Sequence, residues 1–226
     1  MELWTGNPHC QAAHDALVGI LAKTSPFLPP GVPLGNRRQG NIGEFMAYHL
    51  ARTGVLQHHF AFAMNAFNPL QDISQPGLDV TYLYFDQTDP RLDLMYVQEV
   101  KATGQLDLAY ADKLTTDYSK LFGEDGFLTL NTRIQGLSMQ MELAQSRPDL
   151  AERLINLSET RAQNCLQVRL VPTLIHERIG TAPVPKLVAV KSAITAFGWD
   201  PNHIAPWSIA MEDLLARLSR IAQGLA

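Results

Sequence analysis

The fold of this chain is decided by residues 92–103, which have the sequence LDLMYVQEVKAT. Side chains along a β-strand alternate between the two faces of a sheet, so Met95 and Val97 share one face with Glu99 and Lys101. The residues between them form an opposite face that is also mostly apolar, and we therefore expect a strand that is central in its sheet. A carboxylate and an amine at the end of such a strand lose hydration, so they must pair with each other, bind a metal ion or border a cleft.

A second strand is predicted just upstream, in residues 75–85, which have the sequence QPGLDVTYLYF. A Pro-Gly turn signal precedes a run of β-branched and aromatic residues, which places Asp79 at the beginning of that strand. The polar, proline-containing residues 86–91 are typical of a hairpin loop. Because an antiparallel hairpin sets the start of its first strand beside the end of its second, we expect Asp79 to lie next to Glu99 and Lys101.

Two carboxylates beside a lysine suit a hard divalent cation, since Mg²⁺ prefers oxygen ligands and needs only one or two protein carboxylates. The lysine could then position or deprotonate an attacking water, or stabilise charge that develops on a phosphate. A structural ion pair between Glu99 and Lys101 would also satisfy these residues.

A helix is predicted over residues 40–52, ending at Gly54, with apolar residues at the spacing that docks a helix on a sheet. Glu44 lies beside this apolar stripe, in the expected first turn, and is a candidate fourth member of the site. A structural explanation is also open, because Asn41 and Glu44 have the separation of a capping box and the helix dipole favours an acid there.

These segments resemble the PD-(D/E)XK nuclease superfamily through GE at 43–44, PGLD at 76–79 and EVK at 99–101, within a core of about residues 40–130. The resemblance implies a restriction-endonuclease-like α/β fold: a helix, a three-stranded antiparallel or mixed sheet and a helix, with additional strands and a C-terminal helix. It implies that Asp79 and Glu99 bind Mg²⁺, for which Mn²⁺ can substitute. It further implies that Lys101 is the catalytic lysine and that Glu44 is an auxiliary acid at the metal.

A narrower resemblance is to the nuclease subunit of Hachiman anti-phage systems, which joins such a core to further elements and works with a separate helicase. The shared features are the GE helix, the GLDV strand and the EVK strand. Restriction and repair nucleases have the same pattern, so either a helicase or another defence subunit could be the partner.

Length and composition predict a single domain, because 226 residues with 46% hydrophobic content can bury a sizeable core. No apolar run is long enough to span a bilayer, and the N-terminus lacks the features of a secretion signal. Cys10 and Cys165 form neither a zinc motif nor a disulfide framework. We therefore expect a cytoplasmic protein that does not bind membranes.

The net charge of −4 is unusual for a protein that binds DNA alone, since phosphate contacts with basic residues supply most nonspecific affinity. Delivery of DNA by a partner or a homodimer mate would remove this difficulty, as would local clustering of basic residues. The best basic cluster is Arg37-Arg38, expected in a loop just before the first helix; a solvated loop explains it equally well.

The remaining pattern predicts further elements around this core. Strands are expected at residues 57–67, 166–176 and 186–194, and helices at residues 1–24, 106–122, 134–144, 150–162 and from Ser208, as N-cap, to the C-terminus. The last helix could pack on its own core or against a dimer mate or helicase.

Together these observations predict a magnesium-dependent nuclease that hydrolyses DNA in anti-phage defence or restriction, although RNA has the same phosphodiester link. The alternative is a non-enzymatic subunit that uses the same fold to bind a partner or recognise DNA. The nuclease hypothesis requires Asp79, Glu99 and Lys101 to converge in an open cleft, whereas the scaffold hypothesis allows them to be buried.

Overall fold

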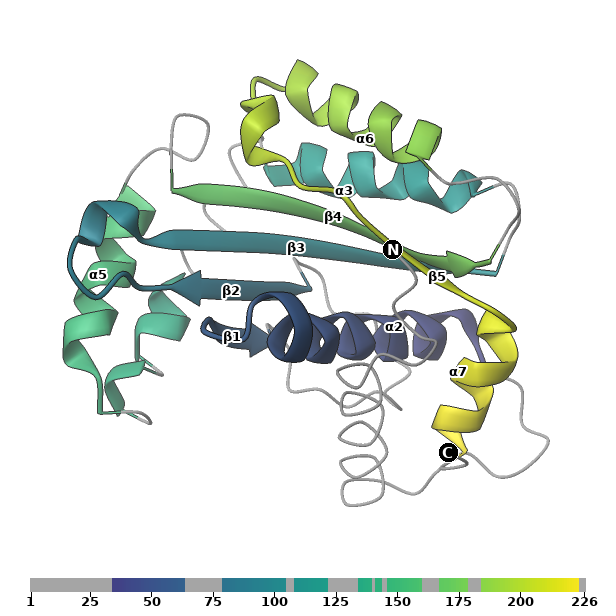
Figure 1. Ribbon diagram of the computed structural model, residues 1–226, viewed down its shortest axis with the longest axis horizontal. Coiled ribbons are helices and arrows are strands. Elements are labelled where there is room, and N and C mark those ends of the chain that lie inside the picture. Colours follow the sequence, from purple (N-terminus) through teal and green to yellow (C-terminus); the bar gives the residue numbers. More distant parts are fainter. Residues whose placement is uncertain are drawn as a thin grey trace.

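The central feature of the computed structural model is one mixed sheet with helices on both faces (Figure 1). The structure describes residues 34–63, 79–104, 108–121, 134–139, 141–143, 146–159, 167–178 and 184–223. The predicted helix over residues 1–24 lies outside them. The mixed α/β class is confirmed.

Five strands make up the described sheet, in the order β1-β2-β3-β4-β5. Their bounds are β1 Phe60–Ala63, β2 Val80–Tyr84, β3 Leu94–Thr103, β4 Val168–Glu177 and β5 Trp207–Met211. β1, β2 and β3 pair antiparallel, whereas β3, β4 and β5 pair parallel. The predicted hairpin is therefore formed by β2 and β3, and β3 is central as its two apolar faces require.

The labelled α-helices are α2 Asn36–Leu50, α3 Asp112–Leu121, α5 Pro148–Glu159, α6 Val184–Ala196 and α7 Leu214–Ala222. A π-helical turn, Ala51–Val55, continues α2, and residues 134–139 and 141–143 are also helical. Along the chain, α2 precedes the first three strands, α3 follows β3, and β4 comes later. No described helix has the combination of length and apolar character needed to cross a membrane.

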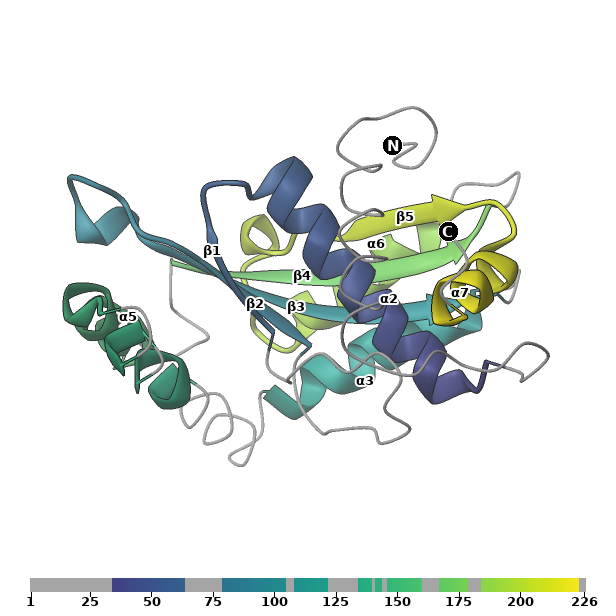
Figure 2. The same ribbon diagram turned by 90° about the horizontal axis from the view of Figure 1, so that it is seen from below.

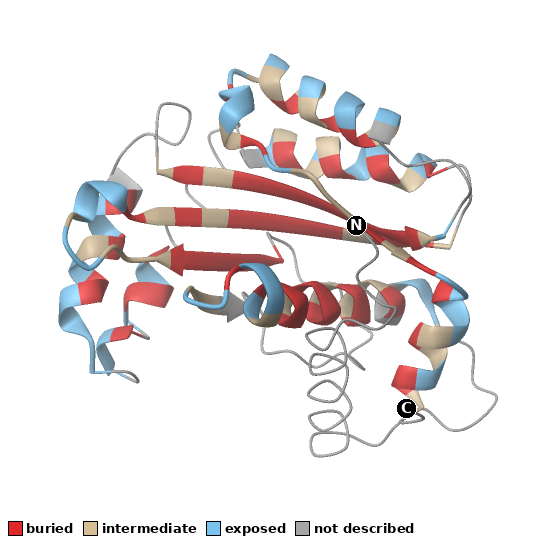
Figure 3. Cartoon of the chain, viewed as in Figure 1, coloured by how far each residue is buried: buried red, intermediate tan, exposed pale blue. Residues whose placement is uncertain are grey.

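Strand alternation divides the core into two main clusters on opposite faces of the sheet (Figure 2). Leu174 of β4 belongs to the cluster that includes residues of α3, α5 and α6, whereas its neighbour Ile175 belongs to the cluster that includes residues of α2 and α7. Buried residues run along most of β3 and β4 (Figure 3), since helices cover both of their faces.

Gly43 allows α2 to lie close to β3. A Cβ atom at this position would be 2.9 Å from the Cβ of Ala102 and 3.6 Å from Cδ1 of Ile175. The first of these separations is shorter than carbon atoms tolerate, so a larger residue would push the helix away from the sheet. The neighbouring residue, Glu44, is thereby held near the sheet.

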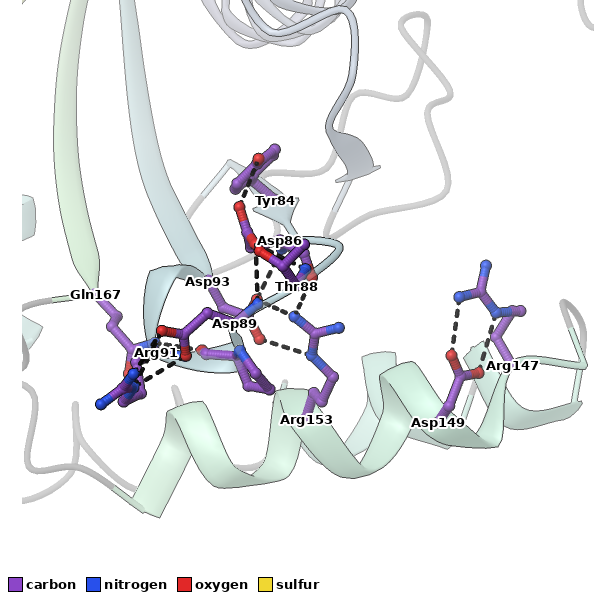
Figure 4. A network of polar contacts seen from close by, with 11 residues as sticks. Tyr84, Asp86, Thr88, Asp89, Arg91, Asp93, Arg147, Asp149, Arg153 and Gln167 are labelled. Carbon is purple, nitrogen blue, oxygen red and sulfur yellow. Dashed lines mark hydrogen bonds and ion pairs between the residues drawn. The ribbon is translucent and has the colours of Figure 1, made fainter.

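The tip of the β2–β3 hairpin is fixed to α5 by a polar network (Figure 4). Arg153 of α5 forms an ion pair with the buried carboxylate of Asp93 and donates a hydrogen bond to the carbonyl oxygen of Asp86 at 2.8 Å. Its guanidinium group also lies over the ring of Phe85, 5.3 Å from the centroid.

Several predicted elements are confirmed with shifted bounds: the strand at 166–176 is β4, the helix at 150–162 is α5, and α3 begins later than residue 106. The strand expected at 57–67 is β1, although residues 64–67 lie outside the described part. Residues 134–144 are helical where they are described.

The strand predicted at residues 186–194 is wrong, because this segment lies within α6. Its β-branched residues favour a strand locally, but Leu187, Val190 and Ile194 are buried together at helical spacing. Tertiary packing overrides the β-propensity of the segment.

The predicted helix N-cap at Ser208 is also wrong, because Ser208 lies inside β5. Ile209 and Met211 alternate toward the core, and β5 pairs with β4. The helix begins only at Leu214, where the Glu177 carboxylate accepts hydrogen bonds from the backbone N–H groups of Asp213 and Leu214, both at 2.7 Å. A side chain from β4 thus replaces the expected local cap.

The start of the first helix differs from the prediction as well. α2 begins at Asn36, so Arg37 and Arg38 belong to the helix and not to a loop before it. Asn41 and Glu44 lie inside the helix, which excludes the predicted capping box. The first turn contains no acidic residue, and Glu44 therefore requires another explanation.

Candidate active site

Asp79 lies where the hairpin prediction puts it, directly before β2. The β2–β3 register pairs Val80 with Gln98, which continues to Asp79 opposite Glu99. The Oδ2 atom of Asp79 accepts a hydrogen bond from the backbone N–H of Val100 at 2.6 Å. This contact ties the start of β2 to the part of β3 that carries the EVK motif.

Glu99 and Lys101 project from the same face of β3 and contact each other. The Nζ atom of Lys101 is 2.5 Å from Oε1 of Glu99 and 2.8 Å from Oδ2 of Asp117 in α3. One ammonium group therefore bridges a carboxylate of the central strand and a carboxylate of the covering helix.

Glu44 reaches the same site from α2. Its carboxyl group hydrogen-bonds to that of Asp79 and interacts electrostatically with Glu99 and Lys101. The structure thus brings together all four residues that the sequence singled out, from α2, the start of β2 and β3. α2 and α3 lie on opposite faces of the sheet (Figures 1 and 2).

Two residues of α3, Asp117 and Tyr118, were missed by the sequence analysis. The Tyr118 hydroxyl accepts a hydrogen bond from the backbone N–H of Glu99 at 3.2 Å and donates one to the carbonyl oxygen of Val97 at 3.0 Å. Leu114 and Tyr118 are both buried, and Asp117 follows Leu114 by three residues. An acid beside the apolar stripe of a core helix was the available signal.

Burial is the main cause of the unusual electrostatics. Loss of hydration, followed by the nearby Glu99 carboxylate, raises the pKa of Glu44 from its ordinary 4.5 to about 7. Burial likewise raises the pKa of Asp79 and of Glu99, each with a neighbouring carboxylate as the next cause. Burial opposes the charge on Lys101, but attraction to Glu99 and Asp79 outweighs it and raises the pKa of the ammonium group.

A crowded group of carboxyls and an unpartnered oxygen make the site suitable for a cation. Oε2 of Glu99 is buried and has no hydrogen-bond partner within the described residues. Buried carboxylate oxygens normally have partners, so this atom fits a ligand position for Mg²⁺. Within the same residues, no three His, Cys, Asp or Glu side chains form a ready-made metal-binding group. Glu99 and Asp79 each already have one oxygen engaged by a protein donor.

The residues of the site differ in how far they are exposed to solvent. Glu99 and Asp79 are only 3% and 9% exposed, whereas the side chains of Lys101 and Asp117 are 16% and 23% exposed. Glu44 is also partly exposed. The convergence required by the nuclease hypothesis is present, but Glu99 and Asp79 are buried, whereas Lys101, Asp117 and Glu44 are partly exposed.

Comparison of the sequence with protein-family models and with curated proteins found no match to either.

Proposed function

We propose that this protein is a magnesium-dependent nuclease with a restriction-endonuclease-like core, which hydrolyses DNA phosphodiester bonds in the cytoplasm as part of anti-phage defence or restriction. The observation that carries the proposal is the convergence of Asp79, Glu99 and Lys101 at one end of the β2–β3 hairpin, with a buried Glu99 oxygen left without a described partner.

The order of elements supports the proposed core. The chain forms a helix, three antiparallel strands and a second helix in the order α2, β1, β2, β3 and α3. After further helical residues that include α5, it adds β4, which is parallel to β3. Helix, three strands, helix and a further strand are also what the resemblance to the PD-(D/E)XK superfamily implies. The candidate residues lie in three of these elements or directly beside them.

Each residue can be given a role in hydrolysis. Asp79 and Glu99 would hold Mg²⁺, which supplies Lewis acidity toward a phosphodiester oxygen and the attacking water. Lys101 would donate hydrogen bonds to a phosphate oxygen and stabilise the negative charge that develops there. Glu44, whose pKa is about 7, would accept a proton near neutral pH.

The composition supports delivery of DNA by another molecule. The net charge is −4, and the site itself gathers four carboxyl groups around Lys101. Carboxyl groups offer no basic contacts to phosphate, so nonspecific affinity for DNA would be low. A helicase, another defence subunit or a homodimer mate would supply the missing affinity.

A second candidate function is favoured by the low exposure of the carboxylates. If Glu99 and Lys101 form a permanent ion pair, the chain is a non-enzymatic subunit that binds a partner or recognises DNA. In that case no cation displaces the ammonium group from Glu99, and substitution of Glu99 affects only stability.

The test is incubation of the purified protein with plasmid DNA in Mg²⁺, in Mn²⁺ and in chelator. We expect nicking or cutting that requires the metal. Glu99→Gln and Lys101→Ala should each reduce the rate by about 100-fold or more, because they remove a metal ligand and a charge-stabilising donor. Asp149→Asn, an exposed acid in α5, is the matched control and should leave the rate unchanged.

If the isolated protein does not cleave plasmid, a metal-binding measurement distinguishes the nuclease from the non-enzymatic subunit. Mg²⁺ at about 100 times its dissociation constant should raise the free energy of unfolding by about 2.7 kcal/mol. The gain should disappear in Glu99→Gln and persist in Asp149→Asn. Intact plasmid together with no metal-dependent stabilisation would overturn the nuclease proposal and favour the scaffold.

A further inference from the structure

Asp117 occupies a particular place relative to the candidate catalytic lysine. Its Oδ2 atom is 2.8 Å from Nζ of Lys101, and its Oδ1 atom is 2.5 Å from Nζ of Lys120. Both carboxylate oxygens are thus engaged by cations, which fixes the orientation of the group. Lys120 is exposed, whereas Lys101 and Asp117 are partly buried.

Lys101 has two anionic partners, and they come from different elements. Glu99 is two residues away on β3, whereas Asp117 projects from α3. Tyr118, the residue after Asp117, joins α3 to β3. Its hydroxyl hydrogen-bonds to the backbone of both Val97 and Glu99. The position of Asp117 relative to β3 is therefore set by a buried contact next to it.

The two partners would respond differently to a cation. Glu99 has the buried oxygen that fits a metal ligand. A cation bound there would weaken the ion pair between Glu99 and Lys101, because it would share the same negative charge. Asp117 is more exposed than Glu99, and its two oxygens are already paired with Lys101 and Lys120. It would keep its contact with Lys101 when Glu99 turns to the metal.

We propose that Asp117 is a positioning residue for Lys101, which keeps the ammonium group directed at the reacting phosphate while Glu99 binds the cation. The inference rests on the proposed nuclease function for its role in catalysis. The contact with Lys101 can be tested without cleavage.

The first experiment compares wild-type protein with Asp117→Asn and Asp117→Glu in plasmid cleavage. Loss of an outer partner of a catalytic group typically costs about 10- to 100-fold in activity, and we expect that loss in kcat for Asp117→Asn. KM should change by less than about twofold, because Asp117 acts through Lys101 and not on bound DNA. Asp117→Glu should recover part of the rate. Asp112→Asn, an exposed acid of the same helix, is the control.

The second experiment measures how fast an N-hydroxysuccinimide acetate acylates Lys101, by mass spectrometry, with and without Mg²⁺. In the wild type we expect slow acylation that Mg²⁺ does not change. In Asp117→Asn, acylation should be faster, and faster again when Mg²⁺ engages Glu99. In Asp112→Asn it should match the wild type.

The outcomes separate this inference from the proposed function. Equal kcat values and equal acylation rates in wild type and Asp117→Asn would overturn the positioning role. If the wild type neither cleaves DNA nor binds Mg²⁺, the nuclease proposal fails. Faster acylation of Lys101 in metal-free Asp117→Asn would still support the contact between Asp117 and Lys101. Unchanged acylation in that variant would overturn the proposed contact.

Discussion

Acidic side chains gather at both ends of the β2–β3 hairpin, but the two groups are held in opposite ways. At the tip, Asp86 and Asp93 lie in the loop between the strands (Figure 4). At the other end, Asp79 and Glu99 lie side by side with Glu44 and Lys101. At the tip these acids are fixed hydrogen-bond acceptors, whereas at the other end they form a crowded, buried cluster.

At the tip, protein donors surround the carboxylates. Oδ1 of Asp86 accepts hydrogen bonds from the backbone N–H groups of Thr88 and Asp89 and from the Thr88 hydroxyl, while Oδ2 accepts one from the Tyr84 hydroxyl. These hydrogen bonds, chiefly those from the Thr88 and Asp89 backbone, lower the pKa of Asp86 to about 2. Asp93 is paired with Arg153 in the same network.

At the other end, carboxylates outnumber the donors. Burial raises the pKa of Asp79 and Glu99, and the pKa of Glu44 reaches about 7. A satisfied network stabilises a fold, whereas an unsatisfied one costs stability and is retained where it serves a function. Hydrogen-bond partners, and not residue type, therefore distinguish a structural acid from a candidate metal ligand.

The largest expected effect comes from breaking the tip. Asp93→Asn leaves the Arg153 guanidinium without its carboxylate partner in a partly buried place. We expect a loss of about 3 kcal/mol in the free energy of unfolding, measured by urea denaturation.

Two controls make this result specific to the tip. Asp149→Asn removes an exposed partner of Arg147 and should cost less than about 1 kcal/mol. Glu99→Gln in chelator should cost less than Asp93→Asn, because Lys101 retains Asp117 and one charge of a crowded cluster is removed. If Glu99→Gln proved the more costly of the two, the proposed contrast between the ends would be wrong.

A smaller effect is expected where α2 approaches the site. Gly43→Ala places a methyl group 2.9 Å from Cβ of Ala102, which should cost about 2 kcal/mol and move Glu44 away from Asp79. Gly40→Ala, in the same helix, is the matched control, since among the described residues nothing beyond the local helix backbone lies within 4 Å of the added methyl group. It should stabilise the protein by about 0.5–1 kcal/mol. If the two substitutions changed the free energy of unfolding equally, close packing at Gly43 would not explain the position of Glu44.

The last expected effect, which appears only when the pH is changed, is on the stability of the metal-free protein. Glu44 has a folded pKa of about 7 and an ordinary value of 4.5, so folding takes up a proton between these values. Its contribution is complete below pH 4.5 and is lost as the pH rises through 7. Asp86, with a pKa of about 2 against 3.8, contributes above pH 3.8 and loses its contribution as the pH falls through 2.

Carbon-13 NMR of the carboxyl groups, in chelator, measures both midpoints directly. We expect values near 7 for Glu44 and near 2 for Asp86. Mg²⁺ should lower the Glu44 midpoint and leave that of Asp86 unchanged, since a cation favours the charged carboxylate. A Glu44 midpoint near 4.5 without metal would contradict the proposed difference between the two ends of the hairpin.

Sequence periodicity predicted the parts of the fold that depend on neighbouring residues. The alternation around Glu99 and Lys101 fixed which side chains share a face, and the polar loop after Phe85 gave the hairpin that puts Asp79 beside them. The same logic failed for residues 186–194 and for Ser208. There, local preference for a strand or a helix cap was overruled by long-range packing and by pairing with β4.

Local sequence patterns were therefore enough to predict the mixed α/β class, the central strand and the grouping of Asp79, Glu99 and Lys101, because alternation and turn chemistry act over a few residues. Long-range packing was needed to bring Asp117 of α3 to Lys101, to let α2 carry Glu44 to Asp79 past Gly43, and to leave one Glu99 oxygen without a described partner. These outcomes depend on how close separate elements approach in space, a distance that no local pattern encodes.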